Sequence, residues 1–200
     1  MDKRAGTEHT RLSAFILLAL VVLPFLFASG CTDSPVSPSS RQSPQVTTAA
    51  VPGASWKETV LPDLQGRGDV SISRFAGKIV MVPIVSASCP SCIVQLNRQL
   101  AEIDRLYRKN PEQIVIISLD IDPDYGPSFI TAYGEPAGFA GYTARSPPDM
   151  TLQLFHRFGP FAMDTDSIPV ILVCPNGHDL LLPPGVKTAE SLSESIAREC

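Results

Sequence analysis

Two cysteines three positions apart, Cys89 and Cys92, have the residue type and spacing that favour chemistry in this sequence. They follow the apolar run at 79–85, within the stretch S-A-S-C-P-S-C at 86–92. Such a pair can exchange electrons with other thiols, hold a metal ion, or close a structural disulfide. The elements that position the pair decide among these uses.

Cys89 is expected where a buried strand meets the start of a helix. The first N–H groups of a helix lack intrahelical partners, and the helix dipole favours negative charge there. Thiols at such places in C-x-x-C motifs have pKa values of roughly 3.5 to 7.5 instead of about 8.5. Cys89 would therefore attack a partner, and Cys92, one turn further in, would resolve the mixed disulfide. Pro90 suits a first helical turn because its missing N–H is not needed there, and Ser91 adds no charge.

The segments around the pair alternate between strand and helix patterns. Apolar runs rich in β-branched residues predict buried strands at 79–85, 113–121 and 169–174. Apolar residues spaced three and four apart predict helices over 90–108 and 148–158, and a capping pattern predicts a last helix over 188–200. The shorter predicted elements are strands at 70–75, 139–143 and 180–182, a helix at 128–135 and a hairpin turn at 175–179. The predicted class is α/β, with a central mixed β-sheet flanked by helices.

This order of elements, with C-x-x-C after the first core strand and Pro169 opening a later strand, resembles the thioredoxin fold. More specifically, it resembles the membrane-anchored redoxin and TlpA-like families. The resemblance is carried by G-K-I-V-M-V (77–82), S-A-S-C-P-S-C (86–92), I-V-I-I-S-L-D (114–120) and S-I-P-V-I-L-V-C-P-N-G (167–177). It implies a thioredoxin-like domain over 54–200 and thiol–disulfide exchange with protein substrates. It also implies that Pro169 is a cis-proline beside the dithiol; the alternative is a trans-proline that starts an edge strand.

A second resemblance, to the Sco/SenC copper proteins, covers S-F-I-T-A-Y-G-E-P-A-G-F-A-G-Y-T-A (128–144) and F-G-P-F (158–161). Those proteins use C-x-x-x-C and a distant histidine, and Asp166 stands at the expected place of that histidine. Soft thiolates could still bind Cu(I), with His156 or His178 as a conceivable third ligand. A Cu(I) metallochaperone is therefore the alternative function, and no cofactor or metal is expected otherwise.

Two other interpretations of the dithiol stay open. Ser86 stands three residues before Cys89, as a hydroxyl does in peroxiredoxins, which suggests a thiol peroxidase. An inert disulfide is common in exported domains, although a loop this short contributes little loop entropy. Cys174 and Cys200 can form a second disulfide, or Cys174 can be buried as a small hydrophobic residue, which we expect more.

The N-terminal segment has the features of an export signal. A basic region, an apolar stretch and small residues precede Cys31, which predicts a signal peptide over 1–30. The sequence A-S-G-C (28–31) resembles a prokaryotic lipobox, which implies that Cys31 is lipidated and anchors the chain in the bilayer. A signal cut elsewhere or an uncleaved anchor helix is the alternative. The Ser/Pro-rich segment at 31–53 has no apolar period and predicts a disordered tether.

The charge of the chain argues against a nucleic-acid partner. The formal net charge is −4 over 200 residues and −5 without residues 1–30, and the basic residues form no cluster. The sequence thus predicts an extracytoplasmic lipoprotein of a prokaryotic cell envelope. Its expected partners are protein thiols or disulfides and a membrane electron donor or acceptor.

Overall fold

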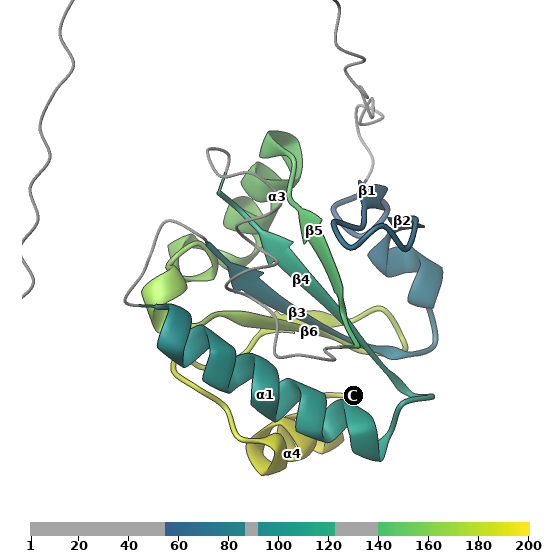
Figure 1. Ribbon diagram of the computed structural model, residues 1–200, viewed down its shortest axis with the longest axis vertical. Coiled ribbons are helices and arrows are strands. Elements are labelled where there is room, and N and C mark those ends of the chain that lie inside the picture. Colours follow the sequence, from purple (N-terminus) through teal and green to yellow (C-terminus); the bar gives the residue numbers. More distant parts are fainter. Residues whose placement is uncertain (1–54, 87–91, 123–139) are drawn as a thin grey trace, which may run out of the picture. The chain divides into compact units, whose positions relative to one another are not determined.

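The computed structural model describes residues 55–86, 92–122 and 140–200, and its central element is a five-stranded sheet (Figure 1). In spatial order the strands are β5 (Tyr142–Arg145), β4 (Ile114–Asp120), β3 (Ile79–Val85), β6 (Val170–Val173) and β7 (Asp179–Leu181). β4 runs parallel to β3 and β5, whereas β6 runs antiparallel to β3 and β7. The predicted mixed sheet is confirmed.

Both faces of this sheet are buried, which is why its strands are continuous apolar runs in the sequence. In β3, Met81 and Val85 belong to one hydrophobic cluster, while Val80, Val82 and Ile84 belong to the other. The first cluster lies under helices α1 (Ile93–Lys109) and α4 (Ala189–Glu199), which contact each other and lie side by side in Figure 1. The second cluster lies under α3 (Pro148–Phe158) and the segment before β3. Alternate residues of one strand therefore fix both helical layers.

The helices follow the predicted periodicity closely. α1 buries Leu96, Leu100 and Ile103, which are spaced four and three apart. α4 begins after Thr188, whose side chain accepts a hydrogen bond from the N–H of Ser191 at 3.2 Å. The residue three positions after this cap is Ser191, so the reciprocal glutamate of a full capping box is absent here.

The clearest difference from prediction is at 70–75. Only β2 (Asp69–Val70) is extended there, paired antiparallel with β1 (Leu61–Pro62), and the chain then forms a 3₁₀ turn, η1 (Ile72–Phe75). The alternation of Val70 and Ile72 does reflect burial, because both are at most 3% exposed. The apolar alternation in the sequence therefore comes from two buried residues. Val70 pairs with Leu61 in a strand, whereas Ile72 lies in the 3₁₀ turn.

Several predictions concern residues outside the described ranges. These are the signal at 1–30, Cys31 and the tether at 31–53, the helix at 128–135, and Cys89, Pro90 and Ser91. Among the described residues, no helix combines the length and hydropathy needed to cross a membrane.

Candidate active site at the start of helix α1

Cys92 is the N-cap residue of α1, the first helix after the central strand β3 in the sequence. Its side chain is nearly buried, at 5% exposure, and its carbonyl accepts the N–H of Leu96 at 2.8 Å. The sulfur of Cys92 takes part in a disulfide whose other sulfur lies outside the described residues. The structure therefore places this cysteine at the positive end of a 17-residue helix and not one turn inside it as predicted, because α1 begins at Ile93 and not at residue 90.

A carboxylate from a distant part of the chain reaches this sulfur. Sγ of Cys92 and Oδ1 of Asp166 are 2.6 Å apart, although the two residues are 74 positions apart in the sequence. Asp166 lies in the short 3₁₀ turn η3 (Thr165–Ser167), and the residue is exposed to solvent. Figure 1 shows the start of α1 beside the yellow-green segment that contains this turn. The sequence had identified Asp166 only as the residue at the place of a copper-binding histidine.

The loop that carries Asp166 has an unusual backbone. Ile168, directly before Pro169, has φ 51° and ψ 61°, and it is the one non-glycine residue with positive φ among the described residues. A β-branched residue is rarely found in this left-handed region, and such conformations cost about 1–3 kcal/mol. The following residue is fixed to the sheet, because the carbonyl of Pro169 accepts the N–H of Ile84 at 3.0 Å. Pro169, the predicted cis-proline, is therefore buried beside the last residues of β3. Its cis isomer stays a prediction.

Lys187 holds the strained residue in place. Its ammonium group donates a hydrogen bond to the carbonyl of Ile168, and its side chain is almost fully buried. The backbone of Lys187 exchanges two hydrogen bonds with the side-chain amide of Gln99, at 2.7 and 3.1 Å. Burial lowers the pKa of Lys187 from 10.5 to about 8, because the charged form loses its hydration. α1, the loop before α4 and the Asp166 loop are therefore joined by one polar network.

A second polar network lies at the ends of β3, β4 and β5. Asp120, the last residue of β4, is fully buried and accepts hydrogen bonds from Arg145 and from the N–H of Asp122. Burial raises the pKa of Asp120, and the hydrogen bonds from Asp122 and Arg145 oppose that shift. Ser86, the hydroxyl considered for a peroxidase, donates to Oδ2 of Asp122 at 3.2 Å. The Ser86 hydroxyl is therefore hydrogen-bonded to the carboxylate that follows β4.

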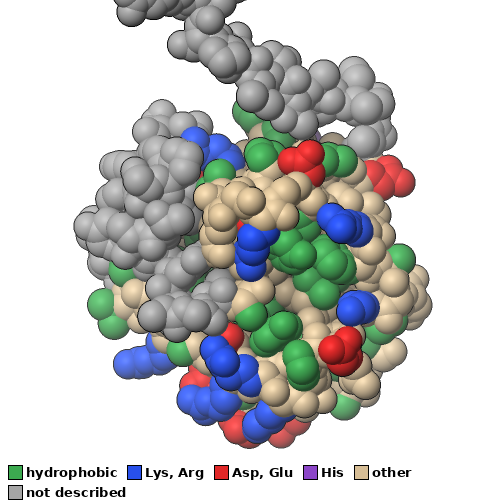
Figure 2. Space-filling model, turned by 45° about the vertical axis from the view of Figure 1, so that its right-hand side comes forward, with side chains coloured by type: hydrophobic (Ala, Val, Ile, Leu, Met, Phe, Trp, Pro, Cys, Tyr) green, Lys and Arg blue, Asp and Glu red, His purple; other side chains and the backbone are tan. Residues whose placement is uncertain are grey.

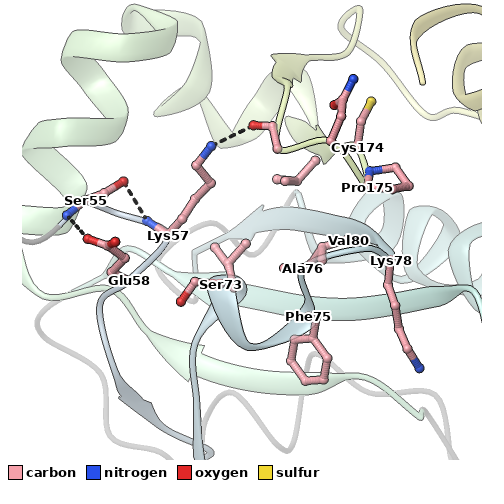
Figure 3. Close-up of a pocket in the computed structure, with 14 residues that line it drawn as sticks. Ser55, Lys57, Glu58, Ser73, Phe75, Ala76, Lys78, Val80, Cys174 and Pro175 are labelled. Carbon is pink, nitrogen blue, oxygen red and sulfur yellow. Dashed lines mark hydrogen bonds between the residues drawn. The ribbon is translucent and has the colours of Figure 1, made fainter.

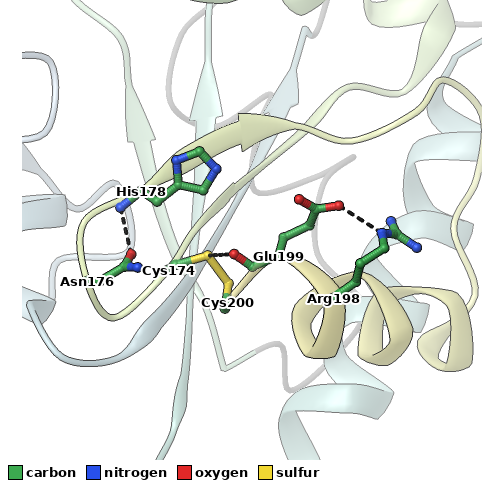
Figure 4. Close-up of a disulfide and its surroundings, with 6 residues drawn as sticks. All are labelled: Cys174, Asn176, His178, Arg198, Glu199 and Cys200. Atoms are coloured by element: carbon green, nitrogen blue, oxygen red, sulfur yellow. Dashed lines mark hydrogen bonds and ion pairs between the residues drawn. A yellow bond between two sulfur atoms is a disulfide. The ribbon is translucent and has the colours of Figure 1, made fainter.

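The two histidines proposed as conceivable metal ligands lie elsewhere. His178 is exposed in the turn after β6, at the end of the strand opposite to Pro169 (Figure 4). His156 is exposed in the last turn of α3, where its ring packs against Phe155. In the part of the chain that the structure describes, no three His, Cys, Asp or Glu residues are grouped to hold a metal ion.

Cys174 and Cys200 form a disulfide that ties the end of β6 to the end of α4 (Figure 4). Their Cα atoms are 5.2 Å apart, and Cys174 is 2% exposed. The expectation that Cys174 is simply a small buried thiol was therefore wrong. Burial was correct, but the end of α4 packs close enough to supply a partner, which the residue pattern of one strand cannot show.

A cavity of about 280 Å³ lies at this same end of the sheet, away from Cys92 (Figure 3). It is lined by Val80 and Val173, by Phe75 of η1 and by Lys57, whose ammonium group is bonded to Gly177 and paired with Asp179. Figure 2 shows hydrophobic side chains at the centre of one face, with basic and acidic side chains around them. Its lining also includes Glu58 and the disulfide-bonded Cys174, and Cys92 does not line it.

The sequence missed Lys187 and Gln99, and it undervalued Asp166. An isolated lysine in the loop L-P-P-G-V-K-T and a glutamine on a helix carry no local signal. Gln99 does occupy a position between Leu96 and Ile103 on the buried side of α1, and a polar residue there indicates a buried partner.

Comparison with known proteins gives matches only among solved structures. No family model matches the chain, and the curated proteins include no match. A DsbF homologue from Corynebacterium diphtheriae is 16% identical, with a TM-score of 0.56, over 72% of this chain and 86% of that one. A secreted Mycobacterium tuberculosis disulfide oxidoreductase homologous to E. coli DsbE is 14% identical, with a TM-score of 0.50, over 72% and 97% of the two chains.

A third structure, from Aquifex aeolicus VF5, is 17% identical with a TM-score of 0.52 and covers 69% of this chain and 89% of that one. At these identities the likeness shows the fold, and the predicted thioredoxin-like fold is confirmed. The Sco-like resemblance is not confirmed.

Proposed function

We propose that this protein is an exported thiol–disulfide oxidoreductase that acts on other proteins through Cys89 and Cys92. The observation that carries the proposal is the position of Cys92, which is disulfide-bonded and nearly buried at the start of the helix that follows the central strand of a thioredoxin-like fold. A cysteine pair at such a helix start favours exchange over a purely structural bond. The disulfide oxidoreductase described above has the same fold.

The proposed reduction proceeds in two displacements. The Cys89 thiolate attacks a disulfide of the partner, forms a mixed disulfide with one partner sulfur and releases the other as a thiolate. Cys92 then attacks Cys89, which forms the Cys89–Cys92 bond and releases the second partner thiolate. Two electrons pass from the protein to its partner, and oxidation of a partner dithiol is the reverse sequence.

The proposal extends to the place of action. The basic, apolar and small-residue pattern before Cys31 supports export and lipid anchoring, and the Ser/Pro-rich segment at 31–53 supports a tether to the membrane. A membrane electron donor or acceptor would then restore the dithiol. The proposal includes no cofactor.

Copper delivery is less well supported by the geometry. Cu(I) prefers soft thiolate and thioether ligands, and the group that reaches Cys92 is a hard carboxylate. Stoichiometric Cu(I) binding that is lost in Cys89→Ser, without activity on a disulfide substrate, would reverse this preference.

The proposed function is tested by turnover of a protein disulfide. We expect the full chain to catalyse reduction of insulin by a small dithiol, and Cys89→Ser to lower the rate at least a hundredfold, because no nucleophile remains. Cys92→Ala should instead hold partners covalently on Cys89. Background rates for the wild-type chain, or full activity of Cys89→Ser, would contradict the proposal.

A further inference from the structure

The contact between Asp166 and Cys92 has a chemical use in the proposed exchange reaction. Cys92 must lose its proton before it can attack the mixed disulfide, because the thiolate is the nucleophile. Its side chain is 5% exposed, and burial in itself disfavours a thiolate. Water has little access to this sulfur, so a nearby proton acceptor would matter.

We propose that Asp166 is the general base that accepts the Cys92 proton during resolution of the mixed disulfide. This proposal rests on the proposed exchange function. Oδ1 of Asp166 is in direct contact with the sulfur, at 2.6 Å, so it can accept a proton from that atom once the thiol has formed. The sulfur is oxidised in this structure and carries no proton, so the contact would become a hydrogen bond only when Cys92 is reduced. Because Asp166 is itself exposed, it can pass the proton on to water.

The step balances without any further reactant. The S–H bond of Cys92 breaks, and its proton moves to Oδ1 of Asp166. The sulfur electron pair forms the bond to Cys89, and the partner sulfur leaves with the electrons of the mixed disulfide. In the reverse direction, protonated Asp166 returns the proton to Cys92 as its thiolate leaves.

The surrounding residues hold this base in position. Asp166 is two residues before Ile168, whose left-handed conformation is held by the ammonium group of Lys187. Through Gln99, Lys187 is bonded to α1, the helix that Cys92 begins. The base and the nucleophile are thus attached to one rigid network, although they come from distant parts of the chain.

The other charged groups on the adjoining elements have different partners or no described contact with this sulfur. Lys187 is bonded to Ile168, and Asp120 is paired with Arg145. Asp122 accepts the hydroxyl of Ser86. Asp164, two residues before Asp166 in the same loop, is exposed and provides a matched control.

The first experiment follows resolution directly. In the full chain carrying Cys31→Ser, the reduced dithiol is mixed with an aromatic disulfide, whose first thiolate is released by Cys89 and whose second is released by Cys92. We expect Asp166→Asn to slow the second release at least tenfold near pH 6, within the usual range for loss of a general base. The difference should disappear at about pH 9 to 10, where the thiol ionises without help. The first release should be unchanged, which shows that the variant is folded at the site.

Controls define the role of the carboxylate. The rate of the second release in Asp164→Asn should equal that of the chain with both aspartates at every pH. Asp166→Glu should recover part of the rate that Asp166→Asn loses. Equal second-phase rates and pH profiles for Asp166→Asn and Asp164→Asn would overturn the proposal while leaving exchange by Cys89 and Cys92 intact. Absence of any first release would instead contradict the proposed function.

A second experiment does not depend on exchange activity. With Cys31→Ser and Cys89→Ser, and the Cys174–Cys200 bond intact, Cys92 is the single thiol, and its ionisation can be followed by the ultraviolet absorbance of the thiolate. Asp166→Asn removes a negative charge next to the sulfur, so the Cys92 thiol should ionise more easily. Its acid ionisation constant should rise about tenfold. Asp164→Asn should change it less than about threefold, because Asp164 has no described contact with the sulfur and its charge is screened by solvent. Identical titrations of the two variants would overturn the proposal.

Discussion

The two ends of the central sheet each hold a disulfide-bonded and nearly buried cysteine, but their surroundings differ. Cys92 lies at one end, at the start of a helix, within 2.6 Å of a carboxylate and beside a loop with a strained residue. Cys174 lies at the other end, bonded to Cys200 and 3.5 Å from the carbonyl oxygen of Glu199. Burial alone therefore does not indicate whether a disulfide reacts. If Cys92 exchanges disulfides as proposed, the charge and the backbone around its sulfur distinguish it from the bond between Cys174 and Cys200.

The sharpest test of this contrast replaces one cysteine at each end. Cys200→Ser should leave insulin reduction within about twofold of wild type, but lower the free energy of unfolding by roughly 3 to 4 kcal/mol. The loss is expected because the bond closes a loop between residues 26 positions apart. Cys92→Ser should give the opposite result, with little change in stability and loss of turnover. Denaturant unfolding and the insulin assay measure the two effects, and a large loss of turnover in Cys200→Ser would remove the contrast.

The pH dependence of stability tests the network at the Cys92 end. The pKa of Lys187 is about 8 in the folded chain against 10.5 for the free side chain, so the unfolded state binds more protons between these values. The contribution of Lys187 to stability should therefore rise with pH across this window, by up to about 3 kcal/mol. Below pH 8 both states are protonated, and the penalty for burying the charge is present in full.

Lys187→Met should remove this rise, as measured by denaturant unfolding at about pH 7.5 and pH 10.5. Lys57→Met is a suitable control, because Lys57 is more exposed and paired with Asp179. If Lys187→Met retained the rise of the wild-type chain, Lys187 would not be its source.

The smallest expected effect concerns the start of α4, the helix that leads to Cys200. Thr188→Ala removes the side-chain acceptor for the N–H of Ser191 and should lower the free energy of unfolding by about 1 kcal/mol. Turnover should not change, because the Thr188 hydroxyl bonds the N–H of Ser191 in α4, whereas the network at the Cys92 end uses the backbone and the ammonium group of Lys187. Thr188→Ser, which keeps the hydroxyl, should lose much less; equal losses in the two variants would show that the cap does not stabilise α4.

The sequence predicts the elements that depend on local pattern. α3 has the predicted limits, 148–158, because proline starts the helix and Gly159 ends it at φ 79°. The strand expected at 70–75 fails because a short alternation of apolar residues records burial and not pairing. β1, only two residues long, has no recognisable pattern at all.

The site divides in the same way. Cys92 could be identified from its spacing to Cys89 and its place after an apolar run. The contacts of Asp166 and Lys187 could not, because they join segments 74 and 19 residues apart whose proximity depends on the assembled sheet. The left-handed conformation of Ile168 was equally hidden, since isoleucine is among the residues least expected there.

The opposite directions of β3 and β6 have a consequence for how the chain acquires its activity. Strand β3 ends, and β6 begins, at the same end of the sheet, where Pro83 pairs with Val170. The chain segments that form the site therefore meet only when these two strands pair. The two strands are separated by more than eighty residues, and such long-range pairings form slowly during folding. Base-assisted resolution should accordingly be absent from early folding intermediates, and its recovery after dilution from denaturant can serve as a kinetic marker for completion of the sheet.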